Sequence, residues 1–331
     1  MKYVTFTMLL LATSCTPMEV SDDVFEFFWS EMDRKYVYFD EKGVDWNAIY
    51  SAYHHRAKAA DEATLLQVFR EVIDTLKDGH VTLLTPDTAL YYNYNYNVET
   101  YEVTMISISN YYDVPVREEL EVDSCYHVFQ LRDSITYIVL YDFYPMFHSQ
   151  KFRSVMAGYA YSKGIIVNVM SNRGGYEHNV AEWSSCFFTG RRTISYEKHK
   201  IGSGHSDFTG YIPIAATGRG VIDEKIPVVL LTGAYTYSGA NLFAAVMKYL
   251  PNVTLMGRAT GGGGSVRPMA VLPNGWKYTY SQAPKYDIHY NSLEQGVTPH
   301  CNVLITREDM EEMQQTGTNK LMEAVYQYLS K

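Results

Sequence analysis

The sequence predicts an α/β fold that is preceded by an N-terminal helical subdomain. Between residues 134 and 257, short runs of buried-strand character ("ITYIVL", "GIIVNV", "PVVLL", "NVTLMG") alternate with helical patterns. Such alternation is typical of a largely parallel sheet whose ligand sites lie at the carboxyl ends of the strands. Upstream of this region, residues 20–77 carry three amphipathic helical patterns.

Each of the three expected helices gathers its apolar side chains on one face. The faces comprise, in order, Val24, Phe27, Phe28 and Met32, then Trp46, Ile49, Tyr50 and Tyr53, then Leu65, Phe69, Val72 and Leu76. Because an apolar face must be buried, these helices should pack together as a small domain or cap. We assign it residues 23–80, and we assign the α/β core residues 81–331.

The sequence between the helices and the core is rich in tyrosine and asparagine. Residues 91–130 alternate in character and contain many aromatic and β-branched residues, which favours exposed strands over disorder. At the other end of the core, Leu321, Val325 and Tyr328 share one face of a final helix.

The first 14 residues have the pattern of an export signal. Lys2 precedes an apolar run that ends near Ala12 and is too short to span a bilayer as a permanent helix. The small residues before Cys15 resemble a bacterial lipoprotein signal, in which that cysteine becomes the lipidated first residue. A plain signal peptide with a chance cysteine is the alternative. With residues 15–22 as a polar tether, the expected location is the bacterial cell envelope, facing the periplasm or the surface.

Composition excludes several classes of partner and cofactor. The chain has 331 residues and a net charge of −9, with no basic stripe, which argues against a nucleic-acid partner. Cys125, Cys186 and Cys301 allow at most one disulfide among themselves, and their spacing fits no zinc pattern. We therefore expect no metal site. The 30 tyrosines can serve packing or line a binding groove.

Ser238 lies where a strand pattern ends and a helix pattern begins, in "VVLLTGAYTYSGANLFAAVMKYLP". Serine is a favoured helix N-cap, so a structural role is one interpretation. The same position offers a hydroxyl the positive end of a helix dipole and free N–H groups, which stabilise a developing negative charge. Ser238 is therefore also a candidate nucleophile.

Two further segments could complete such a site. In "VNVMSNRGGYEH", a strand runs into Gly174 and Gly175, whose bare backbone could form an oxyanion hole or simply a tight turn. In "LKDGH", His80 follows a glycine at a helix–turn–strand junction, where it could turn inward as a base.

The order of several motifs resembles that of the tail-specific, or C-terminal processing, serine peptidases. The motifs are "FFWSEMDRKYVYFDEKGVDWNAIY", "LKDGH", "KGIIVNVMSNRGG", "TYSGANLFAAVM", "LMGRATGGGGS" and "LEQGVTPHCNV". The similarity is closer to the tricorn-like and retinoid-binding-protein-like branch, and it runs from about residue 24 to the end. It implies a crotonase/ClpP-like core in which the serine at the start of a helix is the nucleophile.

The resemblance also indicates which base activates Ser238. One branch uses a lysine in the glycine-rich loop "RATGGGGSVR", where this chain aligns Gly263. Lys248 is no substitute, because ten residues along a helix place it about 15 Å away. The other branch uses a histidine and an acid near the C-terminus, which are His80 and Glu294 here. A histidine base predicts activity that rises through about pH 6 to 7.

By this resemblance the reaction is acyl transfer on a polypeptide substrate, without metal or organic cofactor. The N–H groups of Gly174 and Gly239 would hold the oxyanion, and Glu294 would orient His80 directly or through another polar group. Many relatives carry a PDZ module before "ITYIVL", but only about 50 residues separate that strand from "LKDGH". We therefore expect no PDZ module.

Several residues depart from the family pattern and keep a second hypothesis open. Residues 168–170 read Asn-Val-Met where Asp-Leu-Arg is frequent, and His300 follows Pro299 where aspartate is usual. The alternative is an inactive relative that acts as a peptide- or glycan-binding envelope lipoprotein. Separately, Glu294 could be an ordinary surface carboxylate.

Overall fold

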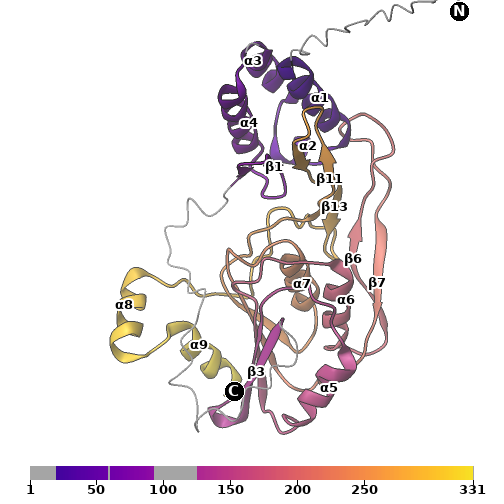
Figure 1. The fold of residues 1–331 in the computed structure, drawn as a ribbon. Coiled ribbons are helices and arrows are strands. Elements are labelled where there is room, and N and C mark those ends of the chain that lie inside the picture. Colours follow the sequence, from indigo (N-terminus) through magenta and orange to yellow (C-terminus); the bar gives the residue numbers. More distant parts are fainter. Residues whose placement is uncertain (1–19, 59, 93–124, 331) are drawn as a thin grey trace, which may run out of the picture.

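The computed structural model describes residues 20–58, 60–92 and 125–330. The chain forms a smaller lobe around the N-terminal helices and a larger α/β lobe that holds the C-terminus (Figure 1). The predicted α/β class with an N-terminal helical region is confirmed. The expected signal, Cys15, and most of the tyrosine-rich segment at 91–130 lie outside the described residues.

A six-stranded sheet forms the centre of the larger lobe, in the order β14-β9-β8-β5-β4-β3. Its strands are β3 (Tyr126–Leu131), β4 (Ile135–Leu140), β5 (Gly164–Asn168), β8 (Val228–Thr232), β9 (Val253–Gly257) and β14 (Cys301–Asn302). From β4 to β14 the neighbours pair in parallel, and β3 is antiparallel to β4. Every residue of β5 and β8 is buried, because helices cover both faces of the sheet.

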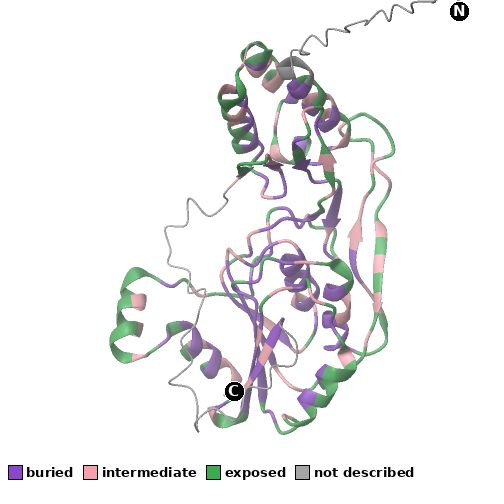
Figure 2. Cartoon of the chain, in the orientation of Figure 1, coloured by how far each residue is buried: buried purple, intermediate pink, exposed green. Residues whose placement is uncertain are grey.

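Five helices cover this sheet. They are α5 (Ser149–Ala157), α6 (Glu177–Ser185) and α7 (Gly239–Lys248) on one face, and α8 (Arg307–Thr316) and α9 (Lys320–Leu329) on the other. Ile165 and Val167 of β5 face the first group, whereas Ile166 faces the second. The resulting core lies at the centre of the lobe (Figure 2). The sequence pattern did not predict α8, which has no fully buried residue and offers only Met310 and Met313 to the core.

The smaller lobe contains the three predicted helices and one additional turn of helix. Its helices are α1 (Val20–Lys35), α2 (Phe39–Lys42), α3 (Trp46–Lys58) and α4 (Glu62–Leu76). The apolar stripe of α4 is buried as expected, but Phe27 of α1 is 38% exposed. α1 begins at Val20, within the segment expected to be a tether.

A hairpin from late in the chain completes the smaller lobe. The strands β1 (Thr82–Leu84), β2 (Ala89–Tyr91), β11 (Met269–Val271) and β12 (Lys277–Thr279) form a sheet in the order β11-β12-β1-β2. Tyr278 of β12 packs against Phe28 with 5.3 Å between ring centroids, and Trp276 packs against Phe69 at 6.2 Å. The N-terminal helices therefore bury their apolar faces partly against residues about 200 to 250 positions away.

A third sheet runs along one side of the molecule, in the order β10-β13-β6-β7 (Figure 1). It contains β6 (Arg191–Glu197), β7 (Ile212–Thr217), β10 (Ser265–Val266) and β13 (Ala283–Tyr286). The chain passes from β10 in this sheet to β11 in the smaller lobe, so the segment around residue 267 lies where the lobes meet. In the part of the chain that the structure describes, no helix is long and apolar enough to cross a membrane.

Candidate active site

Ser238 lies between β8 and α7, directly before the first residue of the helix. Its backbone has φ 54° and ψ −119°, a conformation that costs a residue other than glycine about 1–3 kcal/mol. The side chain makes no capping hydrogen bond. Of the two interpretations of this serine, the structure therefore does not show a side-chain cap, and the hydroxyl is available for another partner.

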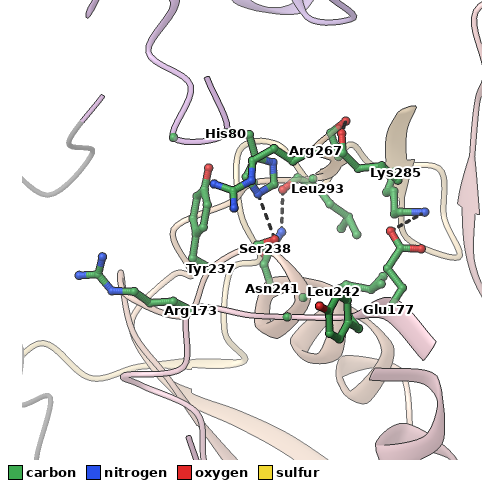
Figure 3. Close-up of a pocket in the computed structure, with 18 of the residues that line it drawn as sticks. His80, Arg173, Glu177, Tyr237, Ser238, Asn241, Leu242, Arg267, Lys285 and Leu293 are labelled. Carbon is green, nitrogen blue, oxygen red and sulfur yellow. Dashed lines mark hydrogen bonds and ion pairs between the residues drawn. The ribbon is translucent and has the colours of Figure 1, made fainter. Parts of the chain in front are cut away.

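That partner is His80, which the smaller lobe supplies. His80 Nε2 lies 3.0 Å from Ser238 Oγ, although the two residues are 158 positions apart (Figure 3). The turn through Asp78 and Gly79 after α4 carries the imidazole to this position. Tyr237 packs edge-on against the imidazole with 5.2 Å between ring centroids. The distance between Nε2 and Oγ is within the range required for proton transfer.

Asp78 holds the backbone that carries His80. Its Oδ1 accepts the N–H of His80 at 2.8 Å, and its Oδ2 accepts the hydroxyls of Tyr36 at 3.0 Å and Ser281 at 2.8 Å. Thr279 Oγ1 donates to the carbonyl of His80 at 2.7 Å. The imidazole Nδ1 is buried and has no hydrogen-bond partner among the described residues. From the sequence we gave Asp78 no role in the site, although its place two residues before a candidate base was a usable signal.

Glu294 lies in the same buried region but does not bond to the imidazole. Its Oε1 is 2.7 Å from Lys42 Nζ, and its Oε2 accepts the N–H of Gly264 at 3.0 Å. The side chain of Glu294 is only 3% exposed, so the surface-carboxylate interpretation is wrong. Burial raises the pKa of Glu294, the nearby Asp78 raises it further, and Lys42 opposes the rise. Any effect of Glu294 on His80 is therefore indirect.

The backbone glycines show which N–H groups could hold an oxyanion. The two glycine segments touch, since a Cβ on Gly174 would lie 2.5 Å from the nitrogen of Gly239. The N–H of Gly174, which we expected to serve, instead donates to Asn172 Oδ1 at 2.8 Å. The N–H groups of Gly175 and Gly239 have no acceptor among the described residues. Gly175 therefore replaces Gly174 as the candidate partner of Gly239.

No lysine among the described residues takes the position of the base. At Gly263, where one branch of the resembled family has its lysine, φ is +78° and a Cβ would lie 2.5 Å from the ring of Tyr237. A lysine there would have to displace the ring that packs against His80. Lys285 does line the cavity, but its ammonium lies 3.0 Å from Glu177 and 2.6 Å from Glu197, so it is committed to ion pairs.

Ser238 and His80 open into a cavity of about 730 Å³. The cavity lies where the lobes meet, and tyrosines, arginines and glycines contribute most of its lining. Its lining includes Tyr91, Tyr92, Tyr144, Arg173, Gly175, Tyr176, Gly239, Gly263 and Arg267. The space is large enough for several residues of an extended peptide.

The charge state of His80 suits a base. Burial lowers the pKa of His80 from its usual 6.5 to about 4; the charges of Arg267 and Lys42 lower it further, and Asp78 opposes them. The imidazole is therefore neutral at pH 7 and can accept the proton of Ser238. The first N–H groups of α7 add a positive potential at the same point.

Comparison with protein families identifies the class of protein. A family model described as "Peptidase family S41" matches residues 134–303, just over half of the 331 residues. A second model, "Tricorn protease C1 domain", matches residues 22–74. The chain belongs to peptidase family S41. It is therefore a serine-type peptidase by class, and its resemblance to the tail-specific group is confirmed.

Several solved structures share the fold of this chain. A candidate peptidase from Parabacteroides merdae ATCC 43184 is 28% identical, with 94% of this chain and 96% of that chain aligned at a TM-score of 0.83. A lipoprotein from Streptococcus agalactiae is 16% identical, with 94% and 98% aligned at 0.52. The photosystem II D1 C-terminal processing protease is 13% identical, with 86% and 92% aligned at 0.52. No curated protein sequence matches the chain significantly.

Removing Lys42 from this S41 chain should be strongly destabilising. Lys42→Met would leave Glu294 and Asp78 buried without their cation, so we expect the free energy of unfolding in urea at pH 8 to fall by about 3–5 kcal/mol. The loss should be smaller at pH 5, because the raised pKa of Glu294 lets it take up a proton there.

The matched control is the double variant Lys42→Met/Glu294→Gln. Neutralising both partners should recover much of the stability lost in the single variant, since no uncompensated charge remains at the pair. If the double variant instead lost as much stability as Lys42→Met and Glu294→Gln lose together, the two side chains would not interact.

Proposed function

We propose that the chain is an envelope-associated serine endopeptidase that cleaves peptide bonds through an acyl-enzyme on Ser238. The observation that carries this proposal is the 3.0 Å contact between His80 Nε2 and Ser238 Oγ at a cavity that can admit a peptide. Membership of family S41 supports the same class of reaction. The strained backbone of Ser238 is a further support, because such conformations cluster at active sites.

The first half of the reaction forms an ester. Neutral His80 accepts the proton of Ser238 Oγ while the oxygen attacks the peptide carbonyl. The resulting oxyanion would lie between the N–H groups of Gly239 and Gly175. When the intermediate collapses, the C–N bond breaks and His80 returns the proton to the leaving nitrogen.

The second half releases the acyl group. Water enters after the leaving peptide departs, and His80 accepts one of its protons as the oxygen attacks the ester carbonyl. Collapse of this second intermediate returns the proton to Ser238 Oγ and frees a carboxylic acid. The atoms balance with water as the second substrate, and the steps use only side chains and backbone groups of this chain.

Charge stabilisation of the imidazolium is assigned to buried carboxylates. The charge of Asp78 favours protonated His80, and its carboxylate accepts the backbone N–H of His80. Glu294 is proposed as a positioning residue, because it holds Lys42 of the smaller lobe and the backbone of Gly264 in the glycine-rich loop. It would thereby fix the position of the smaller lobe relative to the glycine-rich loop on the other side of the cavity.

The envelope location is part of the proposal. It rests on the signal-like N-terminus and on Cys15, and the fold of a lipoprotein from Streptococcus agalactiae is in keeping with it. A lipid-anchored enzyme would meet polypeptides at a membrane surface, in the periplasm or at the cell exterior.

We expect hydrolysis of dye-labelled β-casein to depend on Ser238 and His80. His80→Ala should lower turnover by a factor on the order of 10³, since it removes the base. Because burial holds the pKa of His80 at about 4, activity should rise between roughly pH 3.5 and 5 and be level from about pH 6. This replaces the rise at about pH 6 to 7 that an unperturbed histidine predicts.

Near-UV circular dichroism over the same range is the control for unfolding. The folded protein keeps His80 neutral while the unfolded chain protonates it near pH 6.5, so the stability that His80 contributes is complete above pH 6.5 and is lost as the pH falls toward 4. Near-full activity of His80→Ala would contradict the mechanism. If the folded wild-type protein hydrolysed no more casein than Ser238→Ala does, the inactive, binding alternative would be favoured.

Lipidation predicts that the mature protein begins at Cys15 and partitions with membranes. Two acyl chains give a stable anchor that salt does not release, whereas one gives marginal binding. Cys15→Ser should therefore appear in the soluble fraction, with activity on casein unchanged. Intact-mass analysis that finds an unmodified chain with another N-terminus would refute the anchor without affecting the catalytic proposal.

A further inference from the structure

Arg267 places a positive charge beside the catalytic pair. It follows β10 directly, is exposed, and lines the cavity of Ser238 and His80. Its guanidinium lies close to the imidazole of His80 and to Tyr237 (Figure 3). Burial is the main cause of the lowered pKa of His80, and the charge of Arg267 lowers it further.

This charge has no partner in the described part of the chain. Arg267 forms no ion pair and no hydrogen bond with any described residue. Among the other cations of the cavity lining, Lys285 is paired with two carboxylates. Arg173 contacts the ring of Tyr235, whose centroid lies 5.1 Å from its guanidinium, and it points away from His80 (Figure 3). In a chain with a net charge of −9, an arginine without a counter-charge at the reaction centre is available to an acidic group from outside.

The position of Arg267 indicates which part of a substrate it meets. His80 must reach the nitrogen that leaves, so the residues attached to that nitrogen pass beside the imidazole. Arg267 lies on the same side as the imidazole, at the junction of the two lobes (Figure 3). A side chain one or two residues after the scissile bond would come within its reach.

We propose that Arg267 selects substrates that carry aspartate or glutamate at the first or second position after the scissile bond, on the leaving-group side. The proposal rests on the endopeptidase function given above. A guanidinium offers a carboxylate two parallel N–H donors, which is a geometry that lysine cannot reproduce. The bound carboxylate would also neutralise the charge that opposes formation of the imidazolium, so an acidic residue should help both binding and turnover.

The test compares peptides that differ only by aspartate or asparagine at one position, at about pH 7 and low salt. Placed in either of the first two positions after the scissile bond, aspartate should raise kcat/KM about fivefold or more over asparagine, as expected for an ion pair that substrate binding partly desolvates. Arg267→Gln should remove this preference. Arg267→Glu should reverse the charge preference, so that a peptide with lysine at the same position is cleaved faster than the aspartate peptide.

Arg173→Gln is the matched control, because it removes a positive charge from the same cavity lining at a different place and should keep the preference. Arg267→Gln should also move the acid limb of kcat/KM to higher pH, a shift that a purely structural arginine would not cause. The proposal would be overturned if the wild-type enzyme cleaved the aspartate and asparagine peptides at equal rates, or if Arg267→Gln kept the preference. A preference confined to positions before the scissile bond would also overturn it. Fluorophosphonate labelling of each variant separates this outcome from loss of the catalytic serine itself.

Discussion

The contact between Ser238 and His80 exists only because two lobes meet at one point. The serine belongs to the larger lobe, where it directly precedes α7. The histidine lies in the turn that follows α4 in the smaller lobe. Neither lobe alone contains both groups. The late hairpin β11–β12 connects them, because Thr279 binds the carbonyl of His80 while its strand pairs with β1. Stability of the smaller lobe and geometry of the reaction centre are therefore linked.

The charges around His80 work in opposite directions. Burial and two cations keep the imidazole neutral in the free protein, whereas Asp78 favours the charged form that the proposed mechanism requires. The pair formed by Lys42 and Glu294 sits behind this site and links α2 to the glycine-rich loop. A base that starts neutral and finds a carboxylate nearby once it is protonated is suited to shuttle one proton back and forth.

Local patterns predicted the central strands β4, β5, β8 and β9, because these are continuous apolar runs, and they predicted most of the helices around them. They also located Ser238 and His80, through a strand-to-helix joint and a glycine turn. They did not predict α8 or the strands of the third sheet, β6, β7, β10 and β13. They failed where the deciding contact is a matter of three-dimensional packing. Nothing local to Glu294 shows that its partner is Lys42, about 250 residues away. The error at Gly174 has a different cause, because Asn172 accepts its N–H from only two residues upstream, and this local asparagine turn was a usable signal that we did not apply.

The most direct test of the reaction centre is to map the site of a fluorophosphonate adduct by peptide mass spectrometry. We predict one adduct, on Ser238, which forms at a rate that rises with pH through about 4 to 5, as neutral His80 becomes available. The adduct should be absent in Ser238→Ala and strongly slowed in His80→Ala. An adduct on a different residue, or equal labelling of Ser238 in His80→Ala, would contradict the claim that these two side chains form the reaction centre.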